Sequence, residues 1–491
     1  MPYITTPIYY VNDKPHIGHA YTTIACDVWA RWQRLMGRET FFLTGTDEHG
    51  QKVQQSAEKA GISPQAFTDD VSQRFRDLAN DLDISHDDFI RTTEPRHHQS
   101  AQAFWQKLVD AGAIYEGKYA GWYSVKDEQY FADNEIVNGK APSGHAVEWL
   151  EEPSYFFRLS DYGDRLLKYI ADNPDFIAPE SRKNEVIAFI KDGLQDLSIS
   201  RTSFNWGIKV PGDDKHVMYV WIEALSNYLT ALGYPRNIEK FWPADVHVVG
   251  KDILRFHAVY WPAFLVSADL PLPKRIFAHG WWTNEGQKIS KSLGNVIDPY
   301  DLIERYGLDP VRYFLLREIP FGNDGNFSKE AIKKRVNSDL ANDYGNLCQR
   351  VLAMIVKNCD GRLSDCTPQT QDDSDFIAPL EQLPQEVDAL MQKQAFHKVL
   401  ELIWQHISNA NRYIDAQAPW KLKKTDPVRM HAILSILVDA IRRVTFVTQP
   451  FMPNITAQIF QQLNTDSGNT SLSAGHKINQ PVPLFQKIEG D

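Results

Sequence analysis

The segment that decides the fold lies at the start of the chain, where residues 3–11 read YITTPIYYV. This run is rich in β-branched and aromatic residues and predicts a strand. Apolar residues between Ile24 and Leu35 then recur at steps of three and four, which predicts a helix, and residues 40–44 predict a second strand. The order strand, helix, strand indicates a β-α-β unit that opens a doubly wound parallel sheet.

The same sheet is expected to resume much later in the chain. Residues 246–250 read VHVVG, a buried-strand pattern, and a helical pattern follows from Ile253 to Trp261. Residues 115–228 lie between the two parts; they are rich in aromatics and short strand-like runs and predict an inserted domain. From about Pro299 onward, apolar stripes at helical spacing predict a helical bundle.

The composition excludes several classes of protein. A chain of 491 residues exceeds the size at which one core stops growing, so more than one domain is expected. With 43% hydrophobic and 23% charged residues, it is neither a disordered chain nor a coiled coil. The 52 Lys and Arg against 63 Asp and Glu give a net charge of −11, which argues against general coating of nucleic acid but allows a local basic patch.

Cysteine usage and the N-terminus indicate the compartment. The four cysteines contain no Cys-x-x-Cys pair and are too few for a disulfide framework, which suits a reducing environment. The N-terminus lacks the basic and apolar regions of a signal peptide, and no apolar run approaches the roughly 18 residues of a membrane span. We therefore expect a cytoplasmic protein without a membrane partner.

Two short motifs carry the chemistry. His16-Ile17-Gly18-His19 falls at the turn from the first strand to the first helix, where backbone amides favour phosphate and imidazoles can donate to it. The alternative is that the histidines only cap the helix.

The second motif, KISKSLGN, occupies residues 288–295. Its two ammonium groups, at Lys288 and Lys291, suit a leaving pyrophosphate, because cations stabilise charge that develops in the transition state. The alternative is an exposed basic loop.

The two motifs in this order, with an inserted domain and a helical C-terminal half, resemble the class I aminoacyl-tRNA synthetases, and within them the methionyl-tRNA synthetase family. The likeness rests on residues 3–21, LTGTDEHGQK at 43–52, residues 196–206, 217–221 and 250–253, HGW at 279–281, ANDYGNL at 341–347 and PLF at 483–485. It spans nearly the whole chain, although Ile289 stands where the family more often has Met.

The resemblance implies a ligase that activates L-methionine with ATP to methionyl-adenylate and pyrophosphate. It would then transfer the methionine to the 3′ end of tRNA(Met), initiator and elongator, for translation initiation and elongation. Mg²⁺ is expected on the ATP phosphates. We expect a monomer, because relatives that dimerise often add a C-terminal β-barrel for which the chain has no room.

The implied architecture is an α/β Rossmann-type doubly wound parallel sheet with an inserted connective domain, followed by an all-α anticodon-binding bundle. The expected boundaries are 1–114 and 230–298 for the two halves of the catalytic domain, 115–229 for the insertion, 299–340 for a stem, 341–480 for the bundle and 481–491 for a tail that packs back.

The resemblance also implies roles for single residues. His16, His19, Lys288 and Lys291 would act on the ATP phosphates, with Asp252 on the ribose hydroxyls; an N-cap is the alternative for Asp252. The other expected ATP-site residues are Gly18, Gly250, Ser290 and Ser292. The methionine pocket would comprise Ile8, Tyr10, Asp47, Trp221, Ala224, Leu225, Tyr228, Ile253, His257 and Trp261. Asp47 would pair with the substrate ammonium and aromatic walls would contact the thioether, although aromatic residues at helical spacing are more often core.

The insertion and the bundle complete the predictions. Many relatives bind zinc at Cys-x-x-Cys knuckles, but here residues 121–128 and 143–145 have no cysteine, so we expect no structural zinc despite Asp127, Glu128 and His145. Asn346, Arg350 and Trp420 match anticodon-contacting positions of the family, with an amide and a guanidinium for base edges and an indole for stacking.

Three other functions fit the sequence less well. A class I synthetase for Leu, Ile or Val usually carries an editing domain larger than residues 115–228 allow. A non-catalytic tRNA-binding paralogue has no need for the intact His and Lys motifs together with Asp47 and Asp252. A small-molecule nucleotidyltransferase would have little use for the helical half.

Overall fold

The computed structural model describes residues 1–11, 14–127, 129–131, 133–289, 294–466 and 471–489. These residues form two compact units, 1–280 and 281–491. The parallel sheet of the first unit and the helical bundle of the second confirm the predicted fold class.

The first unit is built on a seven-stranded sheet. Its strands are β1 (Tyr3–Thr5), β2 (Tyr9–Tyr10), β3 (Phe41–Asp47), β4 (Asp88–Arg91), β8 (Ile177–Ala178), β13 (Val246–Gly250) and β14 (Ile276–His279). All of their pairings are parallel: β3 lies between β4 and the successive strands β1 and β2, while β1 continues to β13, β14 and β8. Thus the sheet begun by residues 3–11 does resume at residues 246–250.

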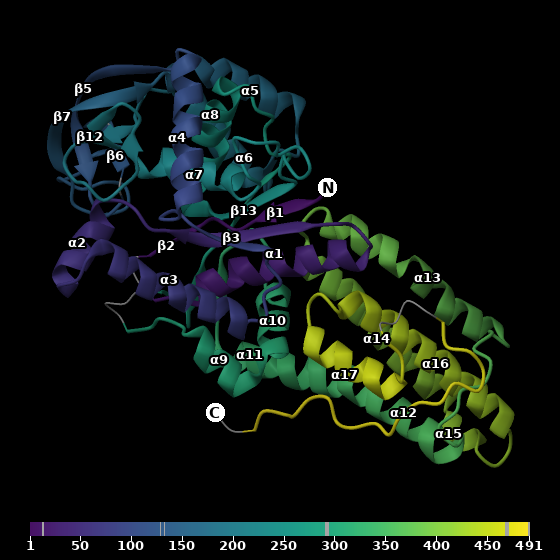
Figure 1. Cartoon of the computed structure of the whole chain (residues 1–491). Helices are drawn as coiled ribbons and strands as arrows, with labels where there is room; N and C mark the ends of the chain where they lie inside the picture. Colours follow the sequence, from purple (N-terminus) through teal and green to yellow (C-terminus); the bar gives the residue numbers. More distant parts are fainter. Residues whose placement is uncertain (12–13, 128, 132, 290–293, 467–470, 490–491) are drawn as a thin grey trace. The chain divides into compact units, whose positions relative to one another are not determined.

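Helices cover both faces of this sheet. The described helices of the first unit are α1 (Ile17–Leu35), α2 (Gln51–Ala60), α3 (Pro64–Asp81), α4 (Pro95–Asp110), α5 (Gly163–Asp172), α6 (Glu180–Lys191), α7 (Val220–Thr230) and α8 (Trp261–Ser267), with the short turns η1 (Asp133–Glu135), η2 (Leu159–Tyr162) and η3 (Lys251–Ile253) and the π-helix η4 (Phe256–Tyr260). Figure 1 shows α1 on one face and α4 and α7 on the other. This is the doubly wound arrangement, in which apolar strands are buried from both sides.

Close packing in this sheet depends on one glycine. A Cβ on Gly45 of β3 would lie 2.1 Å from the carbonyl oxygen of Ile90 in β4. Any other residue there would push the two strands apart. Asp47 ends the same strand.

Residues between the two halves of the sheet add antiparallel structure. One sheet contains β6 (Gln129–Phe131), β5 (Ile114–Ser124), β7 (Glu148–Phe157) and β9 (Leu197–Ser198), and another contains β10 (Ser200–Arg201), β12 (Asp213–Met218) and β11 (Lys209–Val210). Within the same part of the chain, β8 pairs with β14 of the parallel sheet. The chain therefore returns to the central sheet inside residues 115–229, and the predicted domain boundaries stay a prediction.

The second unit begins with a small sheet of β15 (Trp282–Asn284), β16 (Gln287–Lys288) and β17 (Gly325–Phe327). Its helices are α9 (Pro299–Tyr306), α10 (Leu308–Arg317), α11 (Lys329–Arg335), the π-helix η6 (Val336–Gly345), α12 (Asn346–Asn358), α13 (Gln371–Met391), α14 (Phe396–Gln417), α15 (Pro419–Leu422), α16 (Pro427–Thr448) and α17 (Pro453–Leu463). The buried stripes of α12, α14 and α16 are those that the apolar spacing predicts.

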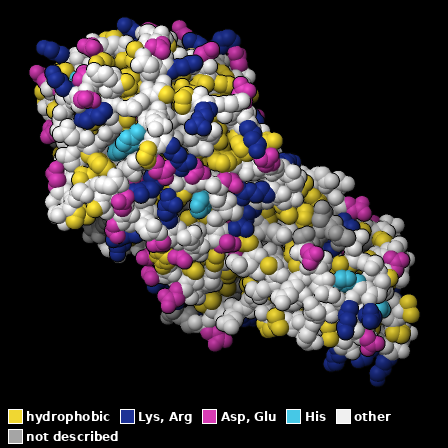
Figure 2. All heavy atoms as spheres, in the orientation of Figure 1, with side chains coloured by type: hydrophobic (Ala, Val, Ile, Leu, Met, Phe, Trp, Pro, Cys, Tyr) yellow, Lys and Arg dark blue, Asp and Glu magenta, His cyan; other side chains and the backbone are white. Residues whose placement is uncertain are grey.

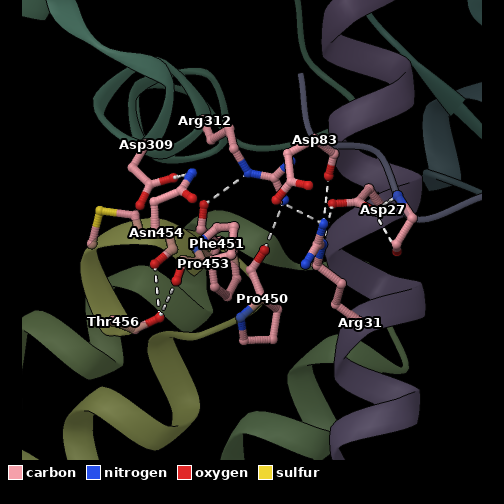
Figure 3. Close-up of polar contacts among 12 residues, drawn as sticks. Asp27, Arg31, Asp83, Asp309, Arg312, Pro450, Phe451, Pro453, Asn454 and Thr456 are labelled. Atoms are coloured by element: carbon pink, nitrogen blue, oxygen red, sulfur yellow. Dashed lines mark hydrogen bonds and ion pairs between the residues drawn. The ribbon is translucent and has the colours of Figure 1, made fainter. Parts of the chain in front are cut away.

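Buried polar contacts tie α10 to the bundle. The fully buried Arg312 donates from Nε to the Phe451 oxygen at 3.1 Å and from Nη2 to the Pro450 oxygen at 2.9 Å. Asp309 accepts from Asn454 Nδ2 at 3.3 Å, one turn earlier on α10 (Figure 3). The two Arg312 bonds satisfy carbonyl groups just beyond the end of α16, in the turn that leads to α17.

The end of the chain lies along this unit. Asn337 exchanges two hydrogen bonds with the backbone of Ile488, at 2.8 and 3.1 Å. A Cβ on Gly345 would stand 2.9 Å from the Phe485 ring. Among the described residues, none of the helices is both long and apolar enough to cross a membrane.

Candidate functional site

The two histidines of the first motif begin helix α1. His16 is its N-cap and accepts from the Gly18 N–H at 3.1 Å through Nδ1, while His19 Nδ1 accepts from the His16 N–H at 3.1 Å. This reciprocal pair is a capping box made of imidazoles. The capping reading and the phosphate reading are therefore compatible, because each cap uses only one ring nitrogen.

The caps define which nitrogen carries the proton. Burial lowers the pKa of His16, which the Asp252 carboxylate partly offsets, and burial with the neighbouring His16 holds the pKa of His19 well below its usual value. Both rings are therefore neutral near pH 7. Since Nδ1 accepts in each, the proton must sit on Nε2. The two rings, 4.0 Å apart between centroids, thus supply two Nε2–H donors at a helix N-terminus.

Asp252 belongs to the same site. It lies in η3, directly after β13, and its carboxylate raises the pKa of His16 and of His279 against the effect of burial. A Cβ on Gly250 would lie 2.4 Å from Asp252 Oδ1, so only glycine leaves the carboxylate its place. The structure thus brings His16, Gly250 and Asp252 together at the carboxyl ends of parallel strands.

The Lys motif is only partly described. Lys288 ends β16, where its backbone pairs with Thr283. Ser290, Lys291 and Ser292 lie outside the described residues. Their convergence with the histidines on one triphosphate stays a prediction.

Helix α7 presents one face to the predicted methionine pocket. Trp221, Ala224, Leu225 and Tyr228 follow each other at helical steps, and Trp221 stacks on Phe256 with centroids 3.8 Å apart. Ile8, Trp221 and Ile253 are half-buried and pack against a core that includes Leu225, Tyr228 and Trp261. The structure therefore gathers these predicted pocket residues around α7.

A hydrogen-bonded pair closes this group. His257 Nδ1 is 3.0 Å from the Ile253 oxygen and its Nε2 is 2.7 Å from the Tyr228 hydroxyl. Burial lowers the pKa of His257 to about 4, so the ring is neutral. Nδ1–H must then donate to the carbonyl, and the Tyr228 O–H donates to Nε2. A phenol and an imidazole are thereby locked in one orientation.

Three further predicted residues differ in setting. Trp261 is fully buried and packs on Phe104 and Tyr228, so it supports Tyr228 from within the core. Tyr10 and Asp47 are direct partners in the pairing of β2 with β3. Direct contact of each with methionine stays a prediction.

Sequence reasoning missed two buried carboxylates, Glu48 and Glu223. Glu48, fully buried, accepts from Arg91 at 2.7 and 2.9 Å and from Thr46 and Thr93. Glu223 accepts from two histidines, His49 and His97. The available signal was Glu223, an acidic residue inside the apolar run of residues 220–225, since charged residues are rarely fully buried unless paired. Glu48 follows Asp47 in a polar stretch and gave no such signal.

In the insertion, Asp127 connects two loops. It accepts from Ser124 and Ser143 at 2.6 Å each and lies 2.7 Å from His145 Nδ1. Glu128 lies outside the described residues. Within the part of the chain that the structure describes, no group of three or more His, Cys, Asp or Glu side chains could hold a metal ion. The expectation of no structural zinc stays a prediction.

The predicted anticodon residues share one region of the second unit. Asn346 and Arg350 lie one turn apart at the start of α12, and the Arg350 guanidinium is 6.0 Å from the ring centre of Trp420 in α15. Arg350 also pairs with Asp415 at 3.0 Å. Trp420 is 44% exposed, and Figure 2 shows Lys and Arg gathered at this end of the bundle, where Lys421, Lys423 and Lys424 are exposed.

Comparison with known proteins covers the whole chain. The family described as "tRNA synthetases class I (M)" matches residues 2–149 and 142–352, and the "Anticodon binding domain of methionyl tRNA ligase" matches residues 364–491. The chain is 54% identical over 506 residues to the methionine–tRNA ligase of Rickettsia felis, covering 100% of this chain and 99% of that protein. It is 54% identical over 505 residues to that of Rhizobium meliloti, covering 99% and 98%.

Solved structures of methionyl-tRNA synthetases also match this chain over nearly its full length. Mycobacterium tuberculosis methionyl-tRNA synthetase in complex with methionyl-adenylate matches with a TM-score of 0.96 and 47% identity, over 99% of each chain. Its apo form matches with a TM-score of 0.90 and 43% identity, over 100% of this chain and 98% of that one.

Proposed function

We propose roles for the residues above from one premise: the chain belongs to the methionyl-tRNA synthetase family of class I aminoacyl-tRNA synthetases. It activates L-methionine with ATP, giving methionyl-adenylate and pyrophosphate, and transfers the methionine to tRNA. The site supports a division of labour between phosphate, ribose, amino acid and anticodon.

In the first step a methionine carboxylate oxygen attacks the α-phosphorus of ATP. The new P–O bond forms as the bond to the β-phosphate breaks, and pyrophosphate leaves with the electron pair. His16 and His19 donate from Nε2 to the phosphates, and Lys288 and Lys291, with Ser290 and Ser292 beside them, offset the charge on the leaving group. Positioning and charge stabilisation provide the catalysis. Mg²⁺ enters with the nucleotide as MgATP.

The remaining substrate groups follow from the same geometry. Asp252 accepts from the ribose hydroxyls, with Gly18 and Gly250 leaving space for the nucleotide against the backbone. Asp47 pairs with the methionine ammonium, and the thioether lies among Trp221, Tyr228, His257 and the other pocket residues. Aromatic rings stabilise sulfur by about 0.3–1.5 kcal/mol for each contact.

In the second unit, Asn346 and Arg350 read base edges and Trp420 stacks on an unpaired base of the tRNA(Met) anticodon. The exposure of Asn346 and Trp420, and the 6.0 Å between the Arg350 guanidinium and the Trp420 ring centre, support this assignment. Both initiator and elongator tRNA share this contact. We further propose that the protein works as a monomer in the cytoplasm, where translation takes place.

The observation that carries the catalytic proposal is the imidazole capping box with two Nε2–H donors. ATP–pyrophosphate exchange with each of the twenty amino acids tests it. We expect exchange with methionine, together with a loss of exchange on removal of either Nε2–H donor. Unchanged exchange in such variants would overturn the assigned histidine role.

A further inference from the structure

One buried carboxylate in the first unit contacts two histidines from distant parts of the chain. Glu223 Oε1 is 2.9 Å from His49 Nδ1, and Glu223 Oε2 is 2.9 Å from His97 Nε2. All three side chains are at most 3% exposed. We call Glu223, His49 and His97 the imidazole clamp.

The clamp is ionised at its centre. Burial alone would raise the pKa of Glu223, but the charge and the hydrogen bonds of His49 and His97 lower it to about 2. Hydrogen bonds to a charged acceptor are about twice as strong as neutral ones. A buried carboxylate must also keep its hydrogen-bond partners in place, since an unpaired charge is costly away from water.

The clamp connects three parts of the chain that lie far apart in the sequence. His49 follows β3 by two residues, His97 lies in the first turn of α4, and Glu223 lies in α7. His97 Nδ1 is also 3.1 Å from Thr230, which lies two turns beyond Glu223 on the same helix. One imidazole therefore holds both ends of α7 against α4.

Glu223 lies on the opposite face of α7 from the pocket. The pocket stripe is Trp221, Ala224, Leu225 and Tyr228, whereas Glu223, Ser226, Asn227 and Thr230 form the other stripe at the same steps. The clamp thus holds the back of the helix whose front faces the methionine side chain. Movement at Glu223 would shift that front as a rigid body.

The two residues that follow Asp47, Glu48 and His49, are also held by hydrogen bonds. Glu48 is held by the Arg91 guanidinium at 2.7 and 2.9 Å, and His49 is held by Glu223. The indole N–H of Trp206 also donates to the backbone carbonyl oxygen of Glu48 at 2.6 Å. The residues that follow Asp47 therefore have little freedom, and the clamp links them directly to α7.

We propose that Glu223 is a positioning residue that sets the separation between the ammonium site at Asp47 and the side-chain pocket on α7, and thereby methionine selectivity. This inference rests on the pocket roles proposed above. An amino acid binds both places at once, so its length is measured by that separation. Loosening the clamp leaves both contacts present but misaligned, and small misplacements are costly in bound geometry.

Steady-state ATP–pyrophosphate exchange tests the proposal in Glu223→Gln, which keeps the shape of the side chain and removes its charge. We expect KM for methionine to rise roughly tenfold, with KM for ATP unchanged within about twofold. The preference for methionine over ethionine, which is one methylene longer, should fall by a similar factor. If Glu223 only stabilised the fold, Glu223→Gln would lower the active fraction and kcat. It would leave KM for methionine and the preference for methionine over ethionine unchanged.

Two further variants keep the test decisive if Glu223→Gln folds poorly. His49→Asn retains an N–H donor at the position of Nδ1, whereas His49→Leu removes it. We expect the Leu variant to raise KM for methionine and the Asn variant to restore most of the loss. Equal KM values in the two variants would overturn the proposal.

Asp27→Asn is the matched control for loss of a buried carboxylate. Asp27 is fully buried in the same unit and accepts from Arg31 Nε at 2.7 Å and from Ser85 at 2.7 Å (Figure 3). It should change thermal unfolding but not the methionine-to-ethionine ratio. If it moves that ratio as much as Glu223→Gln does, the inference is wrong.

Asp47→Asn distinguishes a failure of the Glu223 inference from a failure of the proposed ammonium site. If it raises KM for methionine while folded Glu223→Gln does not, the inference fails and the proposed pocket stands. If Asp47→Asn leaves KM for methionine unchanged, the proposed ammonium site is wrong and the inference falls with it.

Discussion

The proposed amino-acid pocket around α7 and the proposed anticodon surface on α12 and α15 are built on opposite principles. Around α7, Tyr228 and His257 on the pocket side and Glu223 on the opposite face are at most 1% exposed, and each has a defined hydrogen-bond partner. On the bundle, Trp420 is 44% exposed and Asn346 is also exposed. A small substrate offers few contacts and needs groups that are already aligned in a dry site, while a nucleic-acid loop can adapt to exposed side chains.

The largest expected effect tests alignment at the start of α1. His19→Asn keeps a side chain able to cap the helix but removes the Nε2–H donor. We expect kcat for ATP–pyrophosphate exchange to fall by about 10²–10³, the cost of one preorganised donor to developing charge. His19→Gln, whose amide reaches toward the Nε2 position, should recover part of the loss. No difference between the two variants would mean that His19 serves only the helix.

A pH titration should reveal the cost of burial in the pocket. The pKa of His257 is about 4 in the folded protein against 6.5 as its ordinary value. Between these two pH values the unfolded chain binds a proton that the folded chain does not, so stability rises with pH across the window and is lost as pH falls. The loss is about 3 kcal/mol at roughly 1.4 kcal/mol for each pH unit.

His257→Asn provides the comparison, because its amide keeps a donor for the Ile253 oxygen and does not titrate. Chemical unfolding at pH 7 and pH 4.5 should show a smaller acid loss in this variant than in the wild type. Equal losses would show that His257 titrates normally.

The exposed surface predicts a different kind of loss. Trp420→Ala should lower kcat/KM for tRNA by about 5- to 150-fold, the equivalent of 1–3 kcal/mol of base stacking. Methionine-dependent ATP–pyrophosphate exchange should stay unchanged, since Trp420 belongs to the second unit and the proposed methionine-pocket residues belong to the first. Loss of both activities to the same extent would show that Trp420 acts as core.

The smallest effect is expected in the insertion, where neither principle applies. Asp127→Asn should reduce stability by about 1–2 kcal/mol through weaker bonds to Ser124, Ser143 and His145. Addition of a chelator should leave thermal unfolding of the wild type unchanged. Stoichiometric zinc in chelator-washed protein would contradict the prediction that no metal is bound there.

Much of the fold was predictable because its signals are local. The β-prone run at residues 3–11 and the apolar steps of α1 identify the β-α-β unit without reference to the rest of the chain. The two-residue strand β8 gives no comparable pattern, since two residues cannot show a period. It is defined by its partner β14, which lies far along the sequence.

The site divides in the same way. His16 and His19 could be identified from their spacing, and the structure adds which nitrogen each ring uses. The clamp could not be predicted, because His49 and Glu223 are 174 residues apart and no local sequence pattern pairs them. Tertiary contacts of this kind appear only once the chain is folded.

The capping box at the start of α1 also limits how this protein can be redesigned. The Nδ1 lone pair that caps the start of the helix and the Nε2–H donor belong to the same imidazole, so protonation of Nδ1 in acid would remove the cap and leave the Nε2–H in place. An engineer who wants activity in mild acid cannot do so by adjusting surface charge alone. The opening turn of the helix would first need a new cap that leaves the rings free to titrate.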